Sequence, residues 1–507
     1  MWILEHRFSG NYFRSNKLDL GKCDFASQGQ DRSIVNWYLL YLISEWVLRI
    51  MMIPVVTHRR RPNSAMAWLL IIFFEPWFGF LIYVLIGENR LPQRRIRKHD
   101  RLLAKLETLS RRFRDHPQVM KPDYDSRLQS AIDLAERLGY MPILGNNSVE
   151  LLAETDETIN RLIADIDQAQ KHVHMLFYIY RDDKTGNKVN DALARAVARG
   201  VKCRLLLDAV GSSDFLKHNQ QELIDAGIEV HAALPVQFFR RKAARIDLRN
   251  HRKIVVIDGS ISYTGSQNIV DSDYGLKKLA WHDLMIRMEG PVTIELQAVF
   301  LTDWYFETDD ILEGTDIFPD PKSAGSTPIQ TLPSGPSYPT ENHQRMVLSM
   351  LHAAQHQVTI TSPYFIPDEA LLQAIEVAVL RGVEVTLILP EKSDQVIVGA
   401  AARGYYGVLL EMGAHIYLYQ PGLLHAKTIT IDSSICMIGS SNFDIRSFEL
   451  NFELTMMLYG KPINMELKEL QDKYLSLSEK LELSRWNRRP YYQRLFQNVM
   501  RLFSPLL

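Results

Sequence analysis

Apolar residues follow different patterns in different parts of the chain, and each pattern predicts a different kind of structure. After a polar leader over residues 1–33 come two long apolar stretches, residues 34–56 and 65–87. Each is long enough to cross a hydrocarbon layer of about 30 Å as a helix. From residue 126 onward, short β-branched runs alternate with amphipathic segments, which is typical of alternating strands and helices. We therefore predict an N-terminal two-helix transmembrane hairpin followed by an α/β globular part.

Few charged residues interrupt the two apolar stretches. The first contains Glu45 and Arg49, and the second contains Glu75 followed by Pro76. Glu45 and Arg49 are four residues apart, so on a helix they share a face and could pair, which lowers the cost of inserting them in a membrane. A soluble helical hairpin, or a segment lying in the membrane interface, is the alternative to two membrane-spanning helices.

Basic residues around the hairpin predict its orientation. A basic connector, residues 88–125, follows the second stretch, and Lys17, Lys22 and Arg32 precede the first. Cytoplasmic loops are enriched in Lys and Arg, so we expect both ends of the hairpin and the globular part to face the cytoplasm. Three arginines in the short turn, residues 59–61, weaken this signal.

The globular part contains an internal repeat. Each copy reads strand–helix–strand–helix–strand and then ends in the same polar motif. We predict two pseudo-symmetric halves with mixed sheets flanked by helices, residues 126–312 and 340–507. Between them, residues 313–339 are rich in Gly, Pro, Ser and Thr and are predicted to be a linker, with one strand expected over residues 328–332.

The repeated motif is His-x-Lys-x4-Asp-x6-Gly-Ser-x-Asn, within segments 246–273 and 420–447. The first copy consists of His251, Lys253, Asp258, Gly265, Ser266 and Asn268, and the second of His425, Lys427, Asp432, Gly439, Ser440 and Asn442. The His-to-Asn interval is 17 residues in both copies (251 to 268 and 425 to 442). Two identical spacings, each at the end of a repeat, are a strong signal of shared chemistry.

Alternation along a strand places each His and its Lys on one face, directed at a common site. This arrangement suits a phosphodiester, where the attacking group and the leaving oxygen must lie in line on opposite sides of phosphorus. One neutral imidazole attacks and forms a phospho-histidine, while the other, protonated, donates its proton to the leaving alkoxide. Two lysines and two amides, of Lys253, Lys427, Asn268 and Asn442, are expected to hold the phosphate oxygens, so the chemistry requires no metal.

The role of the motif aspartates is open. Asp258 and Asp432 either touch the substrate or hydrogen-bond within their own halves and fix the turn after the strand. His172 and His174 share a strand face, but no third ligand is evident, so we predict no metal site there.

The composition and the motifs that are absent from the sequence argue against several classes of function. Among 507 residues, 58 are Lys or Arg and 59 are Asp or Glu, a net charge of -1, which argues against a nucleic-acid binder. The chain has no Walker-type loop and no Rossmann glycine pattern, so we expect no nucleotide. Three cysteines without a CxxC spacing favour a reducing compartment.

The motif pair resembles that of the phospholipase D superfamily, and the rest of the chain from residue 34 is similar to bacterial cardiolipin synthases of the A type. The similar segments are Pro62-Asn63-Ser64-Ala65-Met66-Ala67-Trp68, Asp247-Leu248-Arg249-Asn250-His251-Arg252-Lys253, Thr264-Gly265-Ser266-Gln267-Asn268, Gly422-Leu423-Leu424-His425-Ala426-Lys427 and Phe503-Ser504-Pro505-Leu506-Leu507. The resemblance implies an enzyme of the bacterial inner membrane that joins two phosphatidylglycerol molecules into cardiolipin and glycerol, without a cofactor.

The resemblance also implies roles for individual residues. The His, Lys and Asp residues of both motifs form the active site, with His251 as nucleophile and His425 as general acid and base. An acidic residue downstream orients each histidine, and the matching positions are Asp283 and Glu453. A phospholipase D that hydrolyses lipid, or a synthase that uses phosphatidylethanolamine, remains an alternative, because water and alcohols enter the same site. A nuclease and an inactive scaffold are more distant alternatives.

Two further segments have the basic-aromatic composition that suits an anionic membrane surface. One is an insertion of 12 residues that only the first half carries, within residues 236–249, and the other is the tail, residues 486–507. Solvated helices whose aromatic side chains pack on the core are the alternative, which is slightly favoured for the tail.

Overall fold

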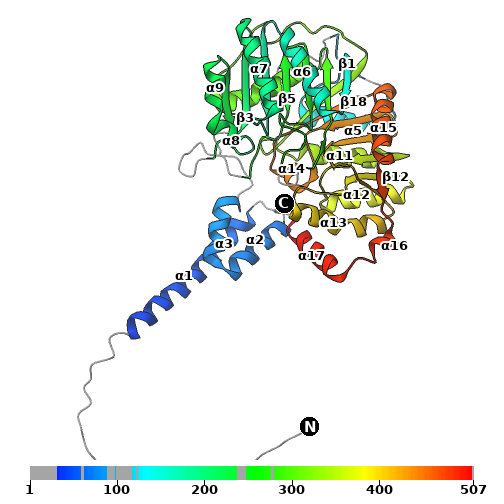
Figure 1. Cartoon of the computed structure of the whole chain (residues 1–507). Helices are drawn as coiled ribbons and strands as arrows, with labels where there is room; N and C mark the ends of the chain where they lie inside the picture. Colours follow the sequence, from blue (N-terminus) through cyan, green and yellow to red (C-terminus); the bar gives the residue numbers. More distant parts are fainter. Residues whose placement is uncertain are drawn as a thin grey trace, which may run out of the picture. The chain divides into compact units, whose positions relative to one another are not determined.

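The computed structural model describes residues 31–58, 62–87, 98, 117–121, 124–236, 247–275 and 279–504. The chain divides into two compact units, Met1–Val84 and Leu85–Leu507 (Figure 1). The insertion's residues 237–246, the turn 59–61 and most of the connector lie outside the described residues, so the predictions made for them stay predictions.

The first unit is built from apolar helices. Helix α1 (Asp31–Thr57) is long and apolar enough over Asn36–Thr57 to cross a membrane, and it packs against α2 (Pro62–Phe74) and α3 (Pro76–Ile82). The expected ion pair is present, with Arg49 3.3 Å from Glu45. Most described side chains on α1 are exposed in the isolated chain.

The second apolar stretch is not one continuous helix, which corrects the prediction for residues 65–87. Helix α2 ends at Phe74, Glu75 adopts a non-helical conformation (φ -134°, ψ 88°), and α3 starts at Pro76. Proline lacks the N–H that would continue the backbone hydrogen bonds of the helix, and it disfavours a helical conformation in the residue before it. Gly79 then packs against the Ile72 backbone, so α3 folds back onto α2.

Most strands of the second unit form one sheet, and its strand order shows the repeat (Figure 1). In spatial order, the first half contributes β4 (Glu229–Ala233), β3 (Lys202–Asp208), β2 (His172–Phe177), β5 (Ile254–Ile257), β6 (Ile261–Gly265), β8 (Met285–Glu289) and β1 (Leu144–Leu152). The sheet continues into the second half with β9 (Thr327–Ser334), β18 (Glu453–Tyr459), β16 (Ile435–Gly439), β15 (Thr428–Ile431), β10 (Gln357–Thr361), β12 (Glu384–Pro390), β13 (His415–Tyr419) and β19 (Ser478–Lys480). Apart from the edge strand β19, one half mirrors the other, which confirms the prediction of two pseudo-symmetric α/β halves.

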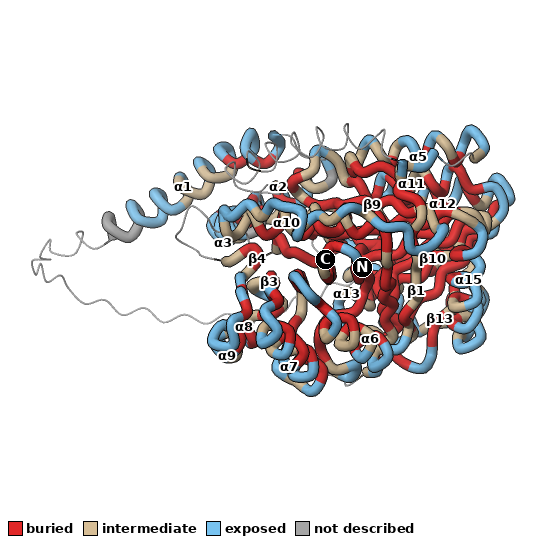
Figure 2. Tube along the Cα trace, turned by 90° about the horizontal axis from the view of Figure 1, so that it is seen from above, coloured by how far each residue is buried: buried red, intermediate tan, exposed pale blue. Residues whose placement is uncertain are grey.

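Helices cover both faces of this sheet and enclose three large cores. The helices of the first half are α6 (Thr155–Gln168), α7 (Lys184–Ala198), α8 (Ser213–His218), α9 (Gln220–Asp225) and α10 (Thr293–Thr308). Those of the second half are α11 (Asn342–Ala353), α12 (Glu369–Leu380), α13 (Val396–Glu411), α14 (Ile445–Glu449), α15 (Lys461–Ser476), α16 (Leu483–Trp486) and α17 (Tyr491–Leu502). Two cores each belong mainly to one half, whereas the third joins α10, α15 and strands of both halves, so buried backbone runs through the whole unit (Figure 2).

Strand pairing and helix packing join the two halves at the predicted linker. The strand expected over residues 328–332 is present as β9, and it pairs antiparallel with β1 and β18 at the centre of the sheet. Helix α5 (Ser126–Gly139) stands at the start of the first half in sequence, yet its apolar face lies in the core of the second half, against α11. The two halves are therefore joined by packing as well as by the chain.

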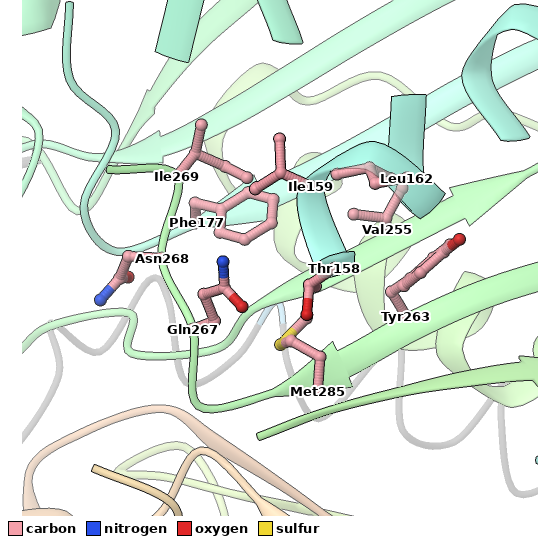
Figure 3. Close-up of a pocket in the computed structure, with 10 residues that line it drawn as sticks. All are labelled: Thr158, Ile159, Leu162, Phe177, Val255, Tyr263, Gln267, Asn268, Ile269 and Met285. Atoms are coloured by element: carbon pink, nitrogen blue, oxygen red, sulfur yellow. The ribbon is translucent and has the colours of Figure 1, made fainter. Parts of the chain in front are cut away.

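A small cavity lies in the core of the first half, between α6 and the strands beneath it (Figure 3). It is lined by Thr158, Ile159, Leu162, Phe177, Val255, Tyr263, Gln267, Asn268, Ile269 and Met285. Neither His251 nor Lys253 is among these residues, so the cavity belongs to the core and is not the place where the motifs meet.

Candidate active site

Each motif histidine is held by the backbone of the opposite half. The His251 amide donates to the Phe452 carbonyl (2.9 Å), and the His425 amide donates to the His282 carbonyl (2.7 Å). Strand β14 (Leu423–Leu424), just before His425, runs parallel to β7 (Trp281–His282) of the first half. Each histidine consequently lies beside the residue that follows Phe452 or His282 in the other half.

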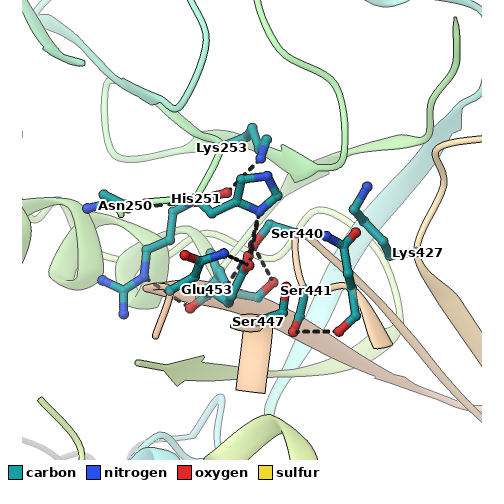
Figure 4. Close-up of polar contacts among 12 residues, drawn as sticks. Asn250, His251, Lys253, Lys427, Ser440, Ser441, Ser447 and Glu453 are labelled. Atoms are coloured by element: carbon teal, nitrogen blue, oxygen red, sulfur yellow. Dashed lines mark hydrogen bonds and ion pairs between the residues drawn. The ribbon is translucent and has the colours of Figure 1, made fainter. Parts of the chain in front are cut away.

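Those neighbouring residues are the two predicted acids, and the pairing is crossed between the halves. His251 Nδ1 lies 3.0 Å from both carboxylate oxygens of Glu453 (Figure 4). His425 Nδ1 lies 2.6 Å from Asp283 Oδ1. With Nδ1 held in each ring, Nε2 is the nitrogen left for chemistry.

The motif serines hold the acids. Ser266 donates to Asp283 Oδ1 (2.6 Å) and Ser440 donates to Glu453 Oε2 (2.5 Å). Both hydroxyls also accept a hydrogen bond from a backbone amide, and both serines are fully buried. Their place in the motif predicts a phosphate-binding or a supporting role for both serines, and hydrogen bonds to the acids favour the supporting role.

Lysines from both halves contribute charge to the same site. Lys253 Nζ donates to the His251 carbonyl (2.7 Å) and Lys427 Nζ donates to the His425 carbonyl (2.6 Å). Burial lowers the pKa of Lys253 to about 8 and that of Lys427 to about 7. Lys253 itself contributes to the lowered pKa of Lys427, which shows that the two motifs are close in space.

Burial also lowers the pKa of the histidines, to about 4 for His251 and about 3 for His425, although their carboxylate partners oppose this shift. Desolvation favours the neutral imidazole, whereas the partners keep the carboxylates ionised. The pKa of Asp283 is lowered to about 2, mainly by His425, against the effect of burial. At neutral pH the unliganded site therefore holds neutral histidines beside charged carboxylates.

The motif aspartates lie elsewhere. Asp258 follows β5, whereas His251 precedes it, which separates them by roughly 20 Å along the extended chain. The Asp258 carboxylate accepts hydrogen bonds from the amides of Gln170, Lys171 and His172, and Asp432 does the same with Gln355, His356 and Gln357. Of the two alternatives left open by the sequence, the geometry favours fixing the turn within each half.

The end of the motif brings the backbone close to the acid-bearing strand. A Cβ on Gly265 would collide with the Leu284 carbonyl, and one on Gly439 with the Leu454 carbonyl, so only glycine fits. Asn268 Oδ1 accepts from the Ile179 amide (3.1 Å). Asn442 Oδ1 is buried and has no hydrogen-bond partner among the described residues, so the two amides are not equivalent.

Two aromatic residues at the histidines were not predicted. The Tyr178 ring makes an edge contact with His251 (centroids 4.9 Å apart), and the Trp281 ring makes one with His425 (4.6 Å). Tyr178 follows β2, at the edge of the sheet that His251 also occupies, and side chains at such a strand end are brought to one site by the fold. That position was a signal available in the sequence.

A buried ion pair beside His251 was also missed. Arg252 binds both carboxylate oxygens of Asp303 (2.8 Å each), and its Nε donates to the Glu453 carbonyl (3.0 Å). The equivalent residue in the second motif is Ala426, so this set of Arg252 contacts, which we call the Arg252 brace, exists only on the His251 side. The sequence did carry a signal for this ion pair, because the first motif has an arginine, Arg252, where the second motif has the apolar Ala426.

The chain is similar to known proteins over most of its length. The family model described as "Cardiolipin synthase, PLD-like domain" matches residues 162–304 and 347–474, and a phospholipase D-nuclease N-terminal model matches residues 46–88. The chain is 36% identical to cardiolipin synthase A of Pectobacterium carotovorum over 489 residues, covering 94% of this chain and 99% of the relative. The same protein of Serratia proteamaculans is also 36% identical, with the same coverage.

A solved structure shares the fold. The phosphatidylserine synthase of Haemophilus influenzae aligns with a TM-score of 0.56 and 14% identity, covering 75% of this chain and all of that protein. The duplicated motif, the crossed acid–histidine pairs and the family model all lie in the same two halves. The chain belongs to the cardiolipin synthase family of phospholipase D-like proteins.

Proposed function

We propose that this protein is a phosphatidyltransferase that makes cardiolipin and glycerol from two molecules of phosphatidylglycerol. The observation that carries the proposal is the crossed pairing, because it holds two histidines from different halves with Nε2 of each free at one site. The family supports the reaction, since the relatives that match nearly the full chain are cardiolipin synthases.

In the first step, His251 Nε2 attacks phosphorus, and the bond from phosphorus to the glycerol oxygen breaks. The leaving oxygen takes a proton from His425 Nε2, and glycerol departs, which leaves a phosphatidyl group on His251. Lys253 and Lys427 stabilise the charge on the phosphate oxygens. The bound phosphodiester anion raises the pKa of His425 and of both lysines, so substrate binding supplies the protonated acid that the unliganded site lacks.

In the second step, the primary hydroxyl of another phosphatidylglycerol gives its proton to His425 Nε2, and its oxygen attacks phosphorus. The bond between phosphorus and His251 breaks, and cardiolipin leaves. One primary-alcohol phosphodiester has replaced another, so the reaction needs no nucleotide to drive it. His251 is assigned as nucleophile because the family resemblance places it there and because the Arg252 brace distinguishes its side of the site.

The membrane is the natural location for this reaction. Helix α1 is apolar and long enough to anchor the chain, and both substrates are lipids. With the basic residues flanking the hairpin, this favours an inner-membrane protein whose catalytic unit faces the cytoplasm. Protease protection of tags placed at each end of the chain in oriented vesicles tests the orientation.

The decisive experiment incubates the purified full chain with phosphatidylglycerol alone and quantifies every product. Cardiolipin and glycerol in equal amounts are expected, whereas phosphatidic acid as the main product would show a hydrolase and overturn the proposal. A parallel incubation with phosphatidylethanolamine tests the alternative acceptor or donor. A lipid-linked enzyme that can be trapped in the His425→Ala variant but not in the His251→Ala variant would identify His251 as the nucleophile, and the reverse result would identify His425.

A further inference from the structure

Helix α17 exposes an apolar stripe on the surface of the catalytic unit. The large side chains of the stripe occupy positions that share one side of a helix, and all are exposed: Tyr492 (69%), Leu495 (50%), Phe496 (46%), Val499 (38%), Leu502 (77%) and Phe503 (47%). Isolated exposed apolar residues are ordinary, but a contiguous stripe marks an interaction surface.

The opposite, largely polar side of α17 is the one that packs on the protein. Gln497 is buried and lies over Gly404 of α13, where a Cβ would come within 2.9 Å of the Gln497 carbonyl. The Arg501 guanidinium lies over the Tyr405 ring (4.5 Å), and Tyr405 shares a hydrogen bond with Ser504 (3.1 Å). Ordinary surface helices bury their apolar side, so this reversed orientation leaves the stripe available for something outside the catalytic unit.

Further exposed apolar side chains lie at the N-terminal end of α13. Val396 and Ile397, at the start of that helix, are 63% and 52% exposed, and Ile397 shares a helix face with Gly404 seven residues later. Just before them, Asp394 accepts a hydrogen bond from Tyr364 (2.6 Å). Tyr364 follows Thr361 of β10, and Thr361 pairs with Thr428 of β15, which comes three residues after His425. This places Tyr364 at the same end of the sheet as His425.

The charge around the stripe identifies the partner. Residues 483–504 contain five arginines and no acidic residue: Arg485, Arg488, Arg489, Arg494 and Arg501. Arg488 and Arg494 are exposed, and Arg494 lies on the same side of the helix as Gln497 and Arg501. An apolar stripe within a basic segment that has no acidic residue matches the interface of a bilayer that contains anionic lipid.

We infer that α17 and the N-terminal end of α13 dock in the surface of an anionic bilayer and bring lipid headgroups to the site rim at Tyr364. The inference rests on the proposed function only in taking the headgroups to be substrates. Docking itself is a property of this surface and is measured without turnover.

The test labels single cysteines with an environment-sensitive fluorophore in the full chain, reconstituted in phosphatidylglycerol-containing vesicles. The background carries Cys23→Ser, since Cys203 and Cys436 are buried thiols. Labels replace Leu495 and Leu502 on the stripe, and Lys188 on the exposed surface of α7 is the control. Lipids brominated on the acyl chains are expected to quench labels at 495 and 502, whereas aqueous iodide quenches only the label at 188.

Each other outcome overturns the inference. Quenching of the stripe labels by iodide alone would show a free surface. Protection from both quenchers would show that protein covers the stripe, either a second copy or another segment of this chain. In the docked protein, Arg494→Gln is expected to weaken docking about fivefold, and zwitterionic vesicles are expected to weaken it further.

A turnover experiment separates this inference from the proposed function. The variant with Leu495→Ser, Phe496→Ser and Val499→Ser is expected to lose activity on phosphatidylglycerol in vesicles but to keep it on short-chain, monomeric phosphatidylglycerol. Equal activity of variant and parent on vesicles would overturn the role of the stripe. Absence of cardiolipin formation by the parent protein would instead overturn the proposed function and leave the quenching result intact.

Discussion

At the residue scale, the site depends on two carboxylates that reach across the molecule. Glu453 comes from the second half and holds His251 of the first, while Asp283 does the reverse for His425. Neither half alone contains a histidine together with its acid, so a complete catalytic pair exists only when both halves are folded together.

Replacing Glu453 with glutamine is expected to lower kcat at least about 10²-fold, because a neutral amide neither fixes the His251 tautomer nor stabilises its cationic form. Steady-state cardiolipin formation measures the effect. Ser440→Ala is the matched control, since it removes one hydrogen bond to the same carboxylate and should cost only about fivefold. Near-normal turnover in the glutamine variant would contradict the orienting role.

The lysines predict the pH dependence. Lys427 and Lys253 have pKa values lowered to about 7 and about 8 by burial, so in the free enzyme each loses its proton as the pH rises through that range. Because the charged forms hold the phosphodiester, kcat/KM is expected to fall above about pH 7. Lys427→Arg should move this fall to higher pH, whatever its absolute rate, because arginine does not titrate there. A profile unchanged by that substitution would assign the fall to another group.

At the element scale, each motif strand is fixed at the end away from its histidine. Asp432 has a left-handed conformation (φ 48°), and its carboxylate accepts hydrogen bonds from three amides at the start of β10, those of Gln355, His356 and Gln357. The strand that carries the motif is thereby tied to its neighbour, and the position of the histidine depends on this tie only indirectly.

Asp432→Ala is therefore expected to lower the free energy of unfolding by at least about 1.5 kcal/mol, because three amides lose a charged acceptor. Turnover per folded molecule should stay within about twofold of the parent. Asp432→Asn, which tolerates the left-handed conformation and keeps one acceptor oxygen, should be milder. Thermal unfolding and turnover are measured on the same samples, and a large loss of turnover without a loss of stability would instead place the carboxylate in the reaction.

At the scale of the whole molecule, the catalytic unit is one body made from two copies of a half. Strands β1 and β9 meet at its centre, α5 packs in the core of the half that follows it later in the chain, and a third core is shared. The covalent connection through the exposed segment 310–325 contributes little of this contact.

A protease site inserted between Glu313 and Lys322 tests this organisation. After cleavage in detergent, the two fragments are expected to co-purify and to keep most of the cardiolipin-forming activity, because the shared sheet and core persist. An insertion without cleavage is the control for the inserted residues. Separation of the fragments under native conditions would show that the halves are held together mainly by the chain.

The sequence by itself determined the two halves and the chemical residues at their ends. A local pattern suffices for this, since period-two alternation places His251 and Lys253 together, and glycine at 265 and 439 anticipates a close backbone approach. Resemblance added Asp283 and Glu453. The apolar composition of residues 65–87 suggested a second continuous helix, which was wrong because Pro76 breaks the helical ladder at Glu75.

Tertiary structure alone decided which acid serves which histidine, and that α5 belongs to the core of the second half. Both depend on contacts between residues far apart in the chain, such as His251 and Glu453, and no local periodicity encodes such a pairing. It also decided that α17 turns its apolar side outward. The amphipathic pattern of a helix gives two sides, but only the surface it packs against determines which of them is buried.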